Sequence, residues 1–343
     1  MRTLVRATNW VGDVVMSLPA VRALRAADPD GTVAILARPW VAELYRLLPE
    51  VDEVVVEGEK TSGEVQAARF DRAVILPTSF SSALALARAG VPERIGYRGE
   101  WRDVFLTKAI RLDLAAGTHQ VWKHLRLAEA AGAAIPAAPD VSWPVSAGVR
   151  EAARSRLAEA GWKGGAFAAA HVASFAHAAK RWELGRFAAV FDDLAARRGL
   201  PVVLLGSGGE KSVNVEAAAL AKKARVFDLS GATSLPEALG VLAEAAFFLG
   251  NDSGLAHLAG AAGTPSVVVF GPTDPEATRP WDGRRADGRP VRLAIARRRT
   301  LCAPCRFAVC PIDHACMEGV TPADVLAAIE SVVPASGTSV SRS

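Results

Sequence analysis

Short apolar runs alternate with helix-length amphipathic stretches along most of the chain, and this alternation limits the possible folds more than any other feature. In the first half, the expected strands are 3–8, 32–37, 53–56, 72–76 and 94–97. The expected helices there are 14–27, 40–47, 81–89 and 119–132. Parallel strands need a long crossover connection, usually a helix, so this order predicts βα units on a parallel sheet.

A second series of the same kind follows a proline-containing stretch. Residues 133–148 hold three prolines and little periodicity, as expected of an interdomain linker. The strands expected beyond it are 166–172, 201–205, 225–229, 246–249 and 266–270. The expected helices are 183–198, 211–223, 236–245, 254–262 and 322–333.

A chain of 343 residues is long enough for two domains, each with its own core. We therefore expect an α/β protein made of two Rossmann-like, doubly wound domains. The N-terminal domain is expected over 1–148 and the C-terminal domain over 149–334. The small, polar stretch 335–343 is expected to be a disordered tail. Two such sheets place a ligand cleft at the carboxyl ends of their strands.

Charge and hydropathy exclude several classes of protein. The net charge is +4, which is too small to imply nucleic-acid binding but is compatible with anionic ligands or an anionic membrane surface. No run of 18 apolar residues predicts a membrane span. The first residues enter a strand directly and lack the apolar core of a signal peptide. A cytoplasmic protein is expected, with contact to the inner face of the inner membrane left open.

The segment 250–257, Gly-Asn-Asp-Ser-Gly-Leu-Ala-His, lies between an expected strand and an expected helix. The first amides of a helix have no partner within the helix and form a natural binding site for diphosphate. Asp252 and Ser253 are residue types that cap helices and that also bind sugar hydroxyls. His257 lies four residues after Ser253, on the same face of the first turn.

Three further positions follow expected strands. Asp13 comes at the start of the first helix, where its carboxylate could accept a proton from a substrate hydroxyl or simply cap the helix. Lys180 and Arg181 follow the first strand of the second series, and cations there suit a diphosphate leaving group. The turn 206–212 is glycine-rich, but it matches neither the Walker phosphate-binding loop nor the dinucleotide-binding pattern G-x-G-x-x-G. Glu210 within this turn could accept hydrogen bonds from ribose hydroxyls.

Two other features leave their chemistry open. Cys302, Cys305, Cys310 and Cys316 lie close together with His314, so they could bind zinc or an iron–sulfur cluster. Their spacing matches no standard pattern, and local disulfides or free thiols that pack an irregular loop are also open. Ser253 lacks the surrounding motif of a hydrolase nucleophile.

A basic stretch with interspersed aromatic residues runs from residue 94 to residue 126. Much of it is expected to form a solvated face. Arg98 and Arg102 within it are candidates for contact with an anionic acceptor.

Together these segments resemble the ADP-heptose:lipopolysaccharide heptosyltransferases, a glycosyltransferase family with the two-domain GT-B fold, and most resemble its heptosyltransferase II branch. The resemblance covers nearly the whole chain and rests on the order and spacing of several short segments. These are 9–13 (Asn-Trp-Val-Gly-Asp), 16–19, 94–100, 180–182 (Lys-Arg-Trp), 251–257, 271–275 and the cysteine segment.

The resemblance implies roles for matching positions. Asp13 matches a general base and Lys180 a cation beside the donor phosphates. Asp252, Ser253, Gly254 and His257 match the donor-binding loop. Ser174 matches a hydroxyl at the phosphate site, and Glu210 a ribose-contacting acid. ADP-heptose is then the donor, bound by the C-terminal domain, and the lipopolysaccharide inner core is the acceptor, bound by the N-terminal domain.

Transfer would invert the anomeric centre in one displacement. The resemblance and the lack of an acidic metal motif imply no cofactor or metal for catalysis. Three alternatives remain from the sequence. One is a GT-B transferase with another donor or a protein acceptor, and another is a non-catalytic nucleotide-sugar-binding protein. A dinucleotide oxidoreductase is disfavoured by the broken glycine fingerprint.

Overall fold

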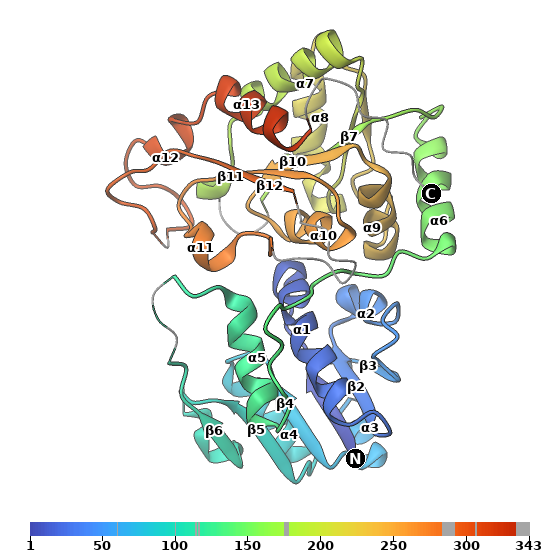
Figure 1. Cartoon of the computed structure of the whole chain (residues 1–343), viewed down its shortest axis with the longest axis vertical. Helices are drawn as coiled ribbons and strands as arrows, with labels where there is room; N and C mark the ends of the chain where they lie inside the picture. Colours follow the sequence, from blue (N-terminus) through green and yellow to red (C-terminus); the bar gives the residue numbers. More distant parts are fainter. Residues whose placement is uncertain are drawn as a thin grey trace. The chain divides into compact units, whose positions relative to one another are not determined.

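The computed structural model describes residues 1–59, 61–99, 101–113, 115, 117–174, 178–282, 292–305 and 307–333. These residues form two compact units that divide between Pro144 and Val145 (Figure 1). The border predicted at 148–149 falls inside a helix, α6 (Ala147–Glu159). The tail predicted over 335–343 lies outside the described residues.

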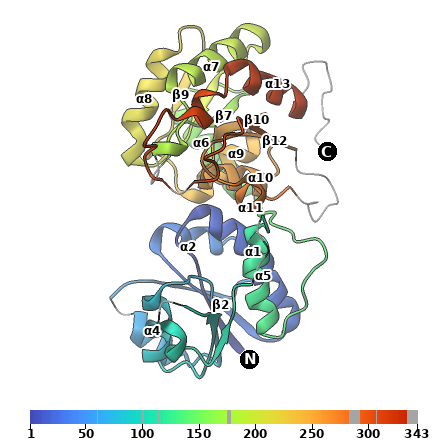
Figure 2. The same ribbon diagram turned by 90° about the vertical axis from the view of Figure 1, so that its left-hand side faces the viewer.

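The N-terminal unit is a parallel sheet of six strands in the order β3-β2-β1-β4-β5-β6. Its elements are β1 Arg2–Arg6, α1 Val11–Ala27, β2 Thr32–Ala37, α2 Pro39–Tyr45, β3 Glu53–Val56, α3 Thr61–Ala68, β4 Arg72–Ile75, α4 Phe80–Arg88, β5 Glu93–Tyr97, the 3-10 turn Arg102–Phe105, β6 Lys108–Ile110 and α5 Gln120–Ala130. Helix α1 packs against α5 and α3 against α4, and Figure 2 shows α4 and α5 on opposite sides of this sheet.

The C-terminal unit repeats the plan with a six-stranded sheet in the order β12-β11-β10-β7-β8-β9. After α6, its elements are β7 Ala168–His171, the 3-10 turn Ala178–Lys180, α7 Leu184–Arg198, β8 Val202–Leu204, the 3-10 turn Gly208–Glu210, α8 Lys211–Leu220, β9 Val226–Asp228, α9 Leu235–Glu244, β10 Phe247–Asn251, α10 Gly254–Ala262, β11 Ser266–Phe270, α11 Pro275–Thr278, β12 Leu293–Arg297, α12 Ala315–Glu318 and α13 Pro322–Val332. Helices α7 and α13 pack together, as do α6 and α9.

The central strands are mostly apolar because helices cover both faces of each sheet. All five residues of β10 and all five of β11 are buried. In the C-terminal unit, one core joins strand residues such as Leu249 to Phe187 and Phe191 of α7 and to Ile329 of α13. This burial holds the carboxyl ends of the strands in fixed positions at one edge of the sheet.

Each sheet reverses its strand order at one point, between β1 and β4 in the first unit and between β7 and β10 in the second. Open α/β sheets bind ligands just outside the carboxyl ends of the strands at this point. The segment with Asp13 follows β1, Ser174 and Lys180 follow β7, and the 252–257 segment follows β10. The order of the strands therefore brings these residues to the two reversal points, whereas Glu210 follows β8 and Arg98 and Arg102 follow β5.

The stretch expected to be a linker is held against the N-terminal unit. The Arg22 guanidinium on α1 donates to the Asp140 carboxylate at 2.7 Å and to the Ser142 carbonyl at 2.8 Å. It also donates to Glu50 at 2.8 Å. The proline-rich composition thus marks an ordered connection. No helix within the described ranges is long and apolar enough to cross a membrane.

Asn251 ties three segments of the C-terminal unit together. Its side chain is fully buried, and its Oδ1 accepts from the Trp182 backbone amide at 3.0 Å. Its Nδ2 donates to the carbonyls of Val172 at 2.8 Å and Ala173 at 3.3 Å. The amide therefore fixes the segments that follow β7 and precede α7 onto the end of β10.

Replacing Asn251 with alanine leaves a buried amide and two buried carbonyls without these partners. We expect Asn251→Ala to lower the free energy of unfolding of the C-terminal unit by about 2–4 kcal/mol. Urea denaturation measures this, with Ser155→Ala on the exposed face of α6 as a control that changes by less than about 0.5 kcal/mol. Equal stability of the two variants contradicts the bracing role.

Candidate functional site

Asp13 is the third residue of α1 and lies in its first turn, half-buried. The residue before the helix, Trp10, provides no side-chain cap. A carboxylate at this end is favoured by the partial positive charge of the helix dipole. The reversal point between β1 and β4 thus carries an accessible carboxylate that can accept a proton.

Lys180 and Asp252 form an ion pair in the C-terminal unit. The Lys180 Nζ lies 2.7 Å from Asp252 Oδ2, and the Thr273 hydroxyl donates to the same oxygen at 2.7 Å. The Asp252 side chain is 5% exposed, whereas that of Lys180 is 23% exposed. The structure therefore brings three loops, those after β7, β10 and β11, onto one carboxylate.

Ser253 begins a hydrogen-bonded chain that the sequence did not reveal. Its Oγ lies 3.0 Å from His171 Nδ1, and His171 Nε2 lies 3.3 Å from Glu210 Oε1. His171 is the last residue of β7 and is buried. It was missed because a histidine inside an apolar strand has no local motif, and only the sheet places it between β8 and β10.

Glu210 is held as a carboxylate by its neighbours. The other oxygen, Oε2, accepts from the Ser207 amide at 2.8 Å and the Ser207 hydroxyl at 2.9 Å. Burial alone would raise the pKa of Glu210. The hydrogen bond and the charge of His171, and the two hydrogen bonds from Ser207, outweigh burial and lower this pKa to about 2. Because this carboxylate only accepts, His171 carries a proton on Nε2. A neutral ring then accepts the Ser253 hydroxyl proton on Nδ1, whereas a charged ring donates from Nδ1 to the Ser253 oxygen.

Ser253 is the N-cap residue of α10, but its side chain makes no capping hydrogen bond. The hydroxyl of this serine interacts with His171 instead. Gly254 is the first residue of α10, and His257 lies in the same turn, 5% exposed. The amino end of α10 thus has no side-chain cap and keeps its affinity for an anion.

Ser174 is buried, and its carbonyl accepts from the Arg181 guanidinium at 3.0 Å. It lies at the end of the segment that Asn251 fixes. Residues 175–177, which follow it, lie outside the described residues.

The two arginines predicted to contact the acceptor differ in exposure. Arg98 is half exposed and pairs with Asp103 at 3.1 Å. Arg102 is fully buried, and its Nη1 donates to the Pro77 carbonyl at 2.6 Å. A guanidinium without exposed surface cannot bind a ligand from solution, so the prediction for Arg102 does not fit the structure. Glu100, at the end of the segment 94–100, lies outside the described residues.

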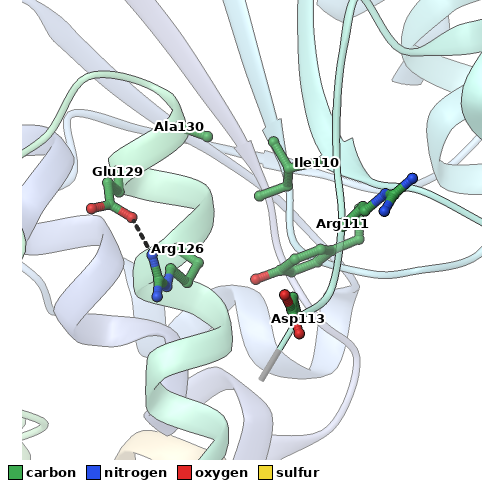
Figure 3. Close-up of a pocket in the computed structure, with 7 residues that line it drawn as sticks. Ile110, Arg111, Asp113, Arg126, Glu129 and Ala130 are labelled. Carbon is green, nitrogen blue, oxygen red and sulfur yellow. Dashed lines mark hydrogen bonds and ion pairs between the residues drawn. The ribbon is translucent and has the colours of Figure 1, made fainter. Parts of the chain in front are cut away.

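The N-terminal unit has a hollow of about 340 Å³ between β6 and α5 (Figure 3). Tyr97, Ile110 and Ala130 form its apolar lining. Arg126 and Glu129 of α5 pair across 3.1 Å, and Figure 3 shows Arg111 extending away from them. Its two arginines, which belong to the basic stretch 94–126, are balanced by Asp113 and Glu129, and its described lining contains neither Arg98 nor Arg102.

The cysteine segment packs beside the Lys180 loop. Cys302, Cys305, Cys310 and Cys316 are free thiols, and burial raises the pKa of Cys316, with a further contribution from the other three. The Cys305 amide donates to the Pro272 carbonyl at 2.7 Å, and His314 Nε2 lies 2.6 Å from the Ala179 carbonyl. In the part of the chain that is described, no three His, Cys, Asp or Glu side chains gather to hold a metal ion.

Comparison with known proteins agrees with this arrangement. The model of glycosyltransferase family 9 (heptosyltransferase) matches residues 60–303. The chain is 32% identical over 307 residues to lipopolysaccharide heptosyltransferase 2 of Escherichia coli, covering 82% of this chain and 85% of that protein. It is 28% identical to lipooligosaccharide heptosyltransferase 2 of Haemophilus influenzae, covering 82% of this chain and 86% of that one.

Two solved structures share the fold. The E. coli ADP-heptose lps heptosyltransferase II superposes with a TM-score of 0.82 at 28% identity, covering 97% of this chain and 98% of that one. The E. coli heptosyltransferase WaaC with ADP gives a TM-score of 0.70 at 21% identity, over 96% and 97% of the two chains. The predicted GT-B fold, with two Rossmann-like α/β domains, is confirmed. This protein belongs to glycosyltransferase family 9, the heptosyltransferases, and is a glycosyltransferase.

Proposed function

We propose that this enzyme transfers heptose from ADP-L-glycero-D-manno-heptose to the inner core of lipopolysaccharide. The observation that carries the proposal is the Lys180–Asp252 pair, which lies beside the uncapped amino end of α10 at the reversal point of the second sheet. The names of the relatives, which are heptosyltransferases acting on lipopolysaccharide or lipooligosaccharide, supply the sugar and the acceptor class. The reaction would take place in the cytoplasm, with the enzyme in peripheral contact with the inner membrane.

The donor diphosphate would bind to Lys180 and the first amides of α10. Both are positive groups, and the helix end is not occupied by a side-chain cap. Lys180 would then contact the diphosphate as well as Asp252. The second oxygen of Asp252 would accept hydrogen bonds from hydroxyls of the heptose.

Ser253 would accept a hydrogen bond from a hydroxyl group of ADP-heptose. When His171 is neutral with its proton on Nε2, the Ser253 proton would be directed to Nδ1, so the oxygen lone pairs of Ser253 would remain for the ligand. Glu210, predicted to contact the ribose, already binds Ser207 and His171, so any further contact would use a remaining lone pair. His171 is thus proposed to position Ser253. Ser174 and His257 would line the same site.

Asp13 would remove the proton from the acceptor hydroxyl as that oxygen attacks the anomeric carbon. The bond from this carbon to the ADP oxygen breaks, its electron pair leaves with ADP, and the proton stays on Asp13. Lys180 and the α10 amides stabilise the charge that develops on the departing diphosphate. A single attack from the opposite face inverts the anomeric configuration. Arg98 remains the exposed candidate for contact with the acceptor.

One experiment tests the whole proposal. The purified enzyme is incubated with ADP-heptose and a series of truncated core acceptors, and the products are weighed by mass spectrometry. One added heptose on one acceptor supports the proposal. A parallel panel of other nucleotide sugars and protein acceptors tests the alternative transferases, and transfer only from one of those would overturn it.

Asp13→Asn is expected to lower kcat at least about 100-fold, because the amide cannot accept the proton. The Kd for ADP, measured by isothermal titration calorimetry, should change less than about twofold, since Asp13 is not placed at the donor site. The matched control is Asp30→Asn, an exposed aspartate of the same unit. Near-normal turnover by Asp13→Asn would remove the base assignment.

Lys180→Ala is expected to weaken ADP binding about tenfold or more and to lower kcat about 100-fold, because one cation is lost from the diphosphate site. Calorimetry and single-turnover rates measure the two effects. Lys163→Ala, an exposed lysine of the same unit, serves as the control. Since the variant strands the buried Asp252 charge, thermal unfolding must show a folded protein at the assay temperature. Unchanged binding and rate in that folded variant would contradict the role.

His171→Leu is expected to raise the KM for the donor about tenfold, because Ser253 loses the partner that orients it. His171→Asn, which keeps a polar group near Ser253, should restore part of the loss. Steady-state kinetics check both. If both variants change only thermal stability and leave KM and kcat as in the parent, His171 is structural and does not position Ser253.

A further inference from the structure

A second cavity, of about 220 Å³, opens at the carboxyl edge of the C-terminal sheet. It is lined on one side by Thr273 and Asp274, which follow β11, and on the other by the residues at the end of β12. Those residues are three consecutive arginines, Arg297, Arg298 and Arg299. The register of the sheet pairs Phe270 with Arg297, so β11 and β12 end at the same level and the two walls lie side by side.

The three guanidinium groups are exposed, and within the described residues none forms a hydrogen bond or an ion pair. Most other arginines of this unit, such as Arg150, Arg186 and Arg279, pair with carboxylates. Two carboxylates lie close to these arginines. Asp274 lines it and caps α11, and Asp324 lies near Arg298. Three adjacent cations on a concave surface repel one another and attract an anion.

The cavity walls are fixed by contacts on both sides. The Thr273 hydroxyl donates to Asp252 at 2.7 Å, and the Cys305 amide donates to the Pro272 carbonyl at 2.7 Å. The stem of Arg298 packs over Gly319, where a Cβ would come within 2.6 Å of Arg298 Cγ. A preformed wall reduces the ordering cost of binding a ligand.

We propose that this arginine pocket binds a phosphate or carboxylate group of the acceptor. The inference rests on the proposed function. The donor has one anionic group, its diphosphate, for which Lys180 and α10 provide a site, and its heptose is neutral. The acidic groups of the inner core are then the remaining anions of the reaction. Arginine binds planar carboxylates and phosphates through two parallel hydrogen bonds, which gives the pocket selectivity for such groups.

The test uses the full-length enzyme with the double variant Arg297→Gln/Arg299→Gln, which leaves the packed stem of Arg298 in place. We expect the KM for the acceptor to rise about tenfold or more, while kcat and the Kd for ADP change less than about twofold. Arg297→Lys/Arg299→Lys should recover part of the affinity because it keeps the charges. Arg292→Gln, an exposed arginine just before the opposite end of β12, is the control and should leave all three quantities unchanged.

Acceptors stripped of phosphate separate the two acidic groups. If the pocket binds phosphate, dephosphorylation raises the KM of the parent enzyme and removes the difference between parent and variant. If it binds carboxylate, the difference persists. An unchanged acceptor KM in the double variant overturns the proposal, as does a weaker ADP affinity, which would assign the pocket to the donor. Loss of binding to phosphatidylglycerol vesicles with an unchanged KM would also overturn it. Failure of the proposed function is distinct, since the parent would then transfer no heptose.

Discussion

The carboxyl ends of parallel strands all meet one edge of a sheet, and this constraint places every residue argued to act in this enzyme. Within each unit the strand order reverses once, and the loops on either side of the reversal diverge and leave room for a ligand. Asp13 follows the central strand of the first sheet. Lys180 and Asp252 follow the two central strands of the second, so residues 72 positions apart in the chain meet at 2.7 Å.

Two neighbouring residues at the end of β10 have separate roles in support and binding. Asn251 faces the interior, and its amide binds backbone groups of two other segments. Asp252 faces the loops, and the described side chains donate to only one of its oxygens. Successive residues of an extended segment point in opposite directions. The amide of Asn251 therefore supports the structure, while the carboxylate of Asp252 points the other way and can bind a ligand.

The sequence predicted the buried elements well and the weakly amphipathic ones poorly. The strands 32–37, 53–56 and 266–270 and the helix 254–262 have the predicted bounds. The short edge strands β6 and β12 were missed because their apolar runs are short and have a charged residue at one end, and α3 and α6 because they bury only one and two residues. The motifs located Asp13, Lys180 and Asp252. His171 and the arginine pocket depend on contacts between strands distant in sequence, and Arg102 was misjudged because burial of an arginine has no local signal.

In the proposed reaction, the Lys180–Asp252 pair would also shape the energetics of donor binding. In the free enzyme the ammonium is already partly neutralised by a buried carboxylate, so a diphosphate gains less from Lys180 than it would from an isolated lysine. At the same time, the lysine side chain is held in place and loses little conformational freedom when the donor binds. The pair therefore weakens the attraction between Lys180 and the diphosphate of the bound donor, and it holds the lysine ammonium in place before the donor binds. Because the negative charge on the leaving ADP increases only as the glycosidic bond breaks, a fixed cation stabilises the transition state more than it stabilises the bound donor.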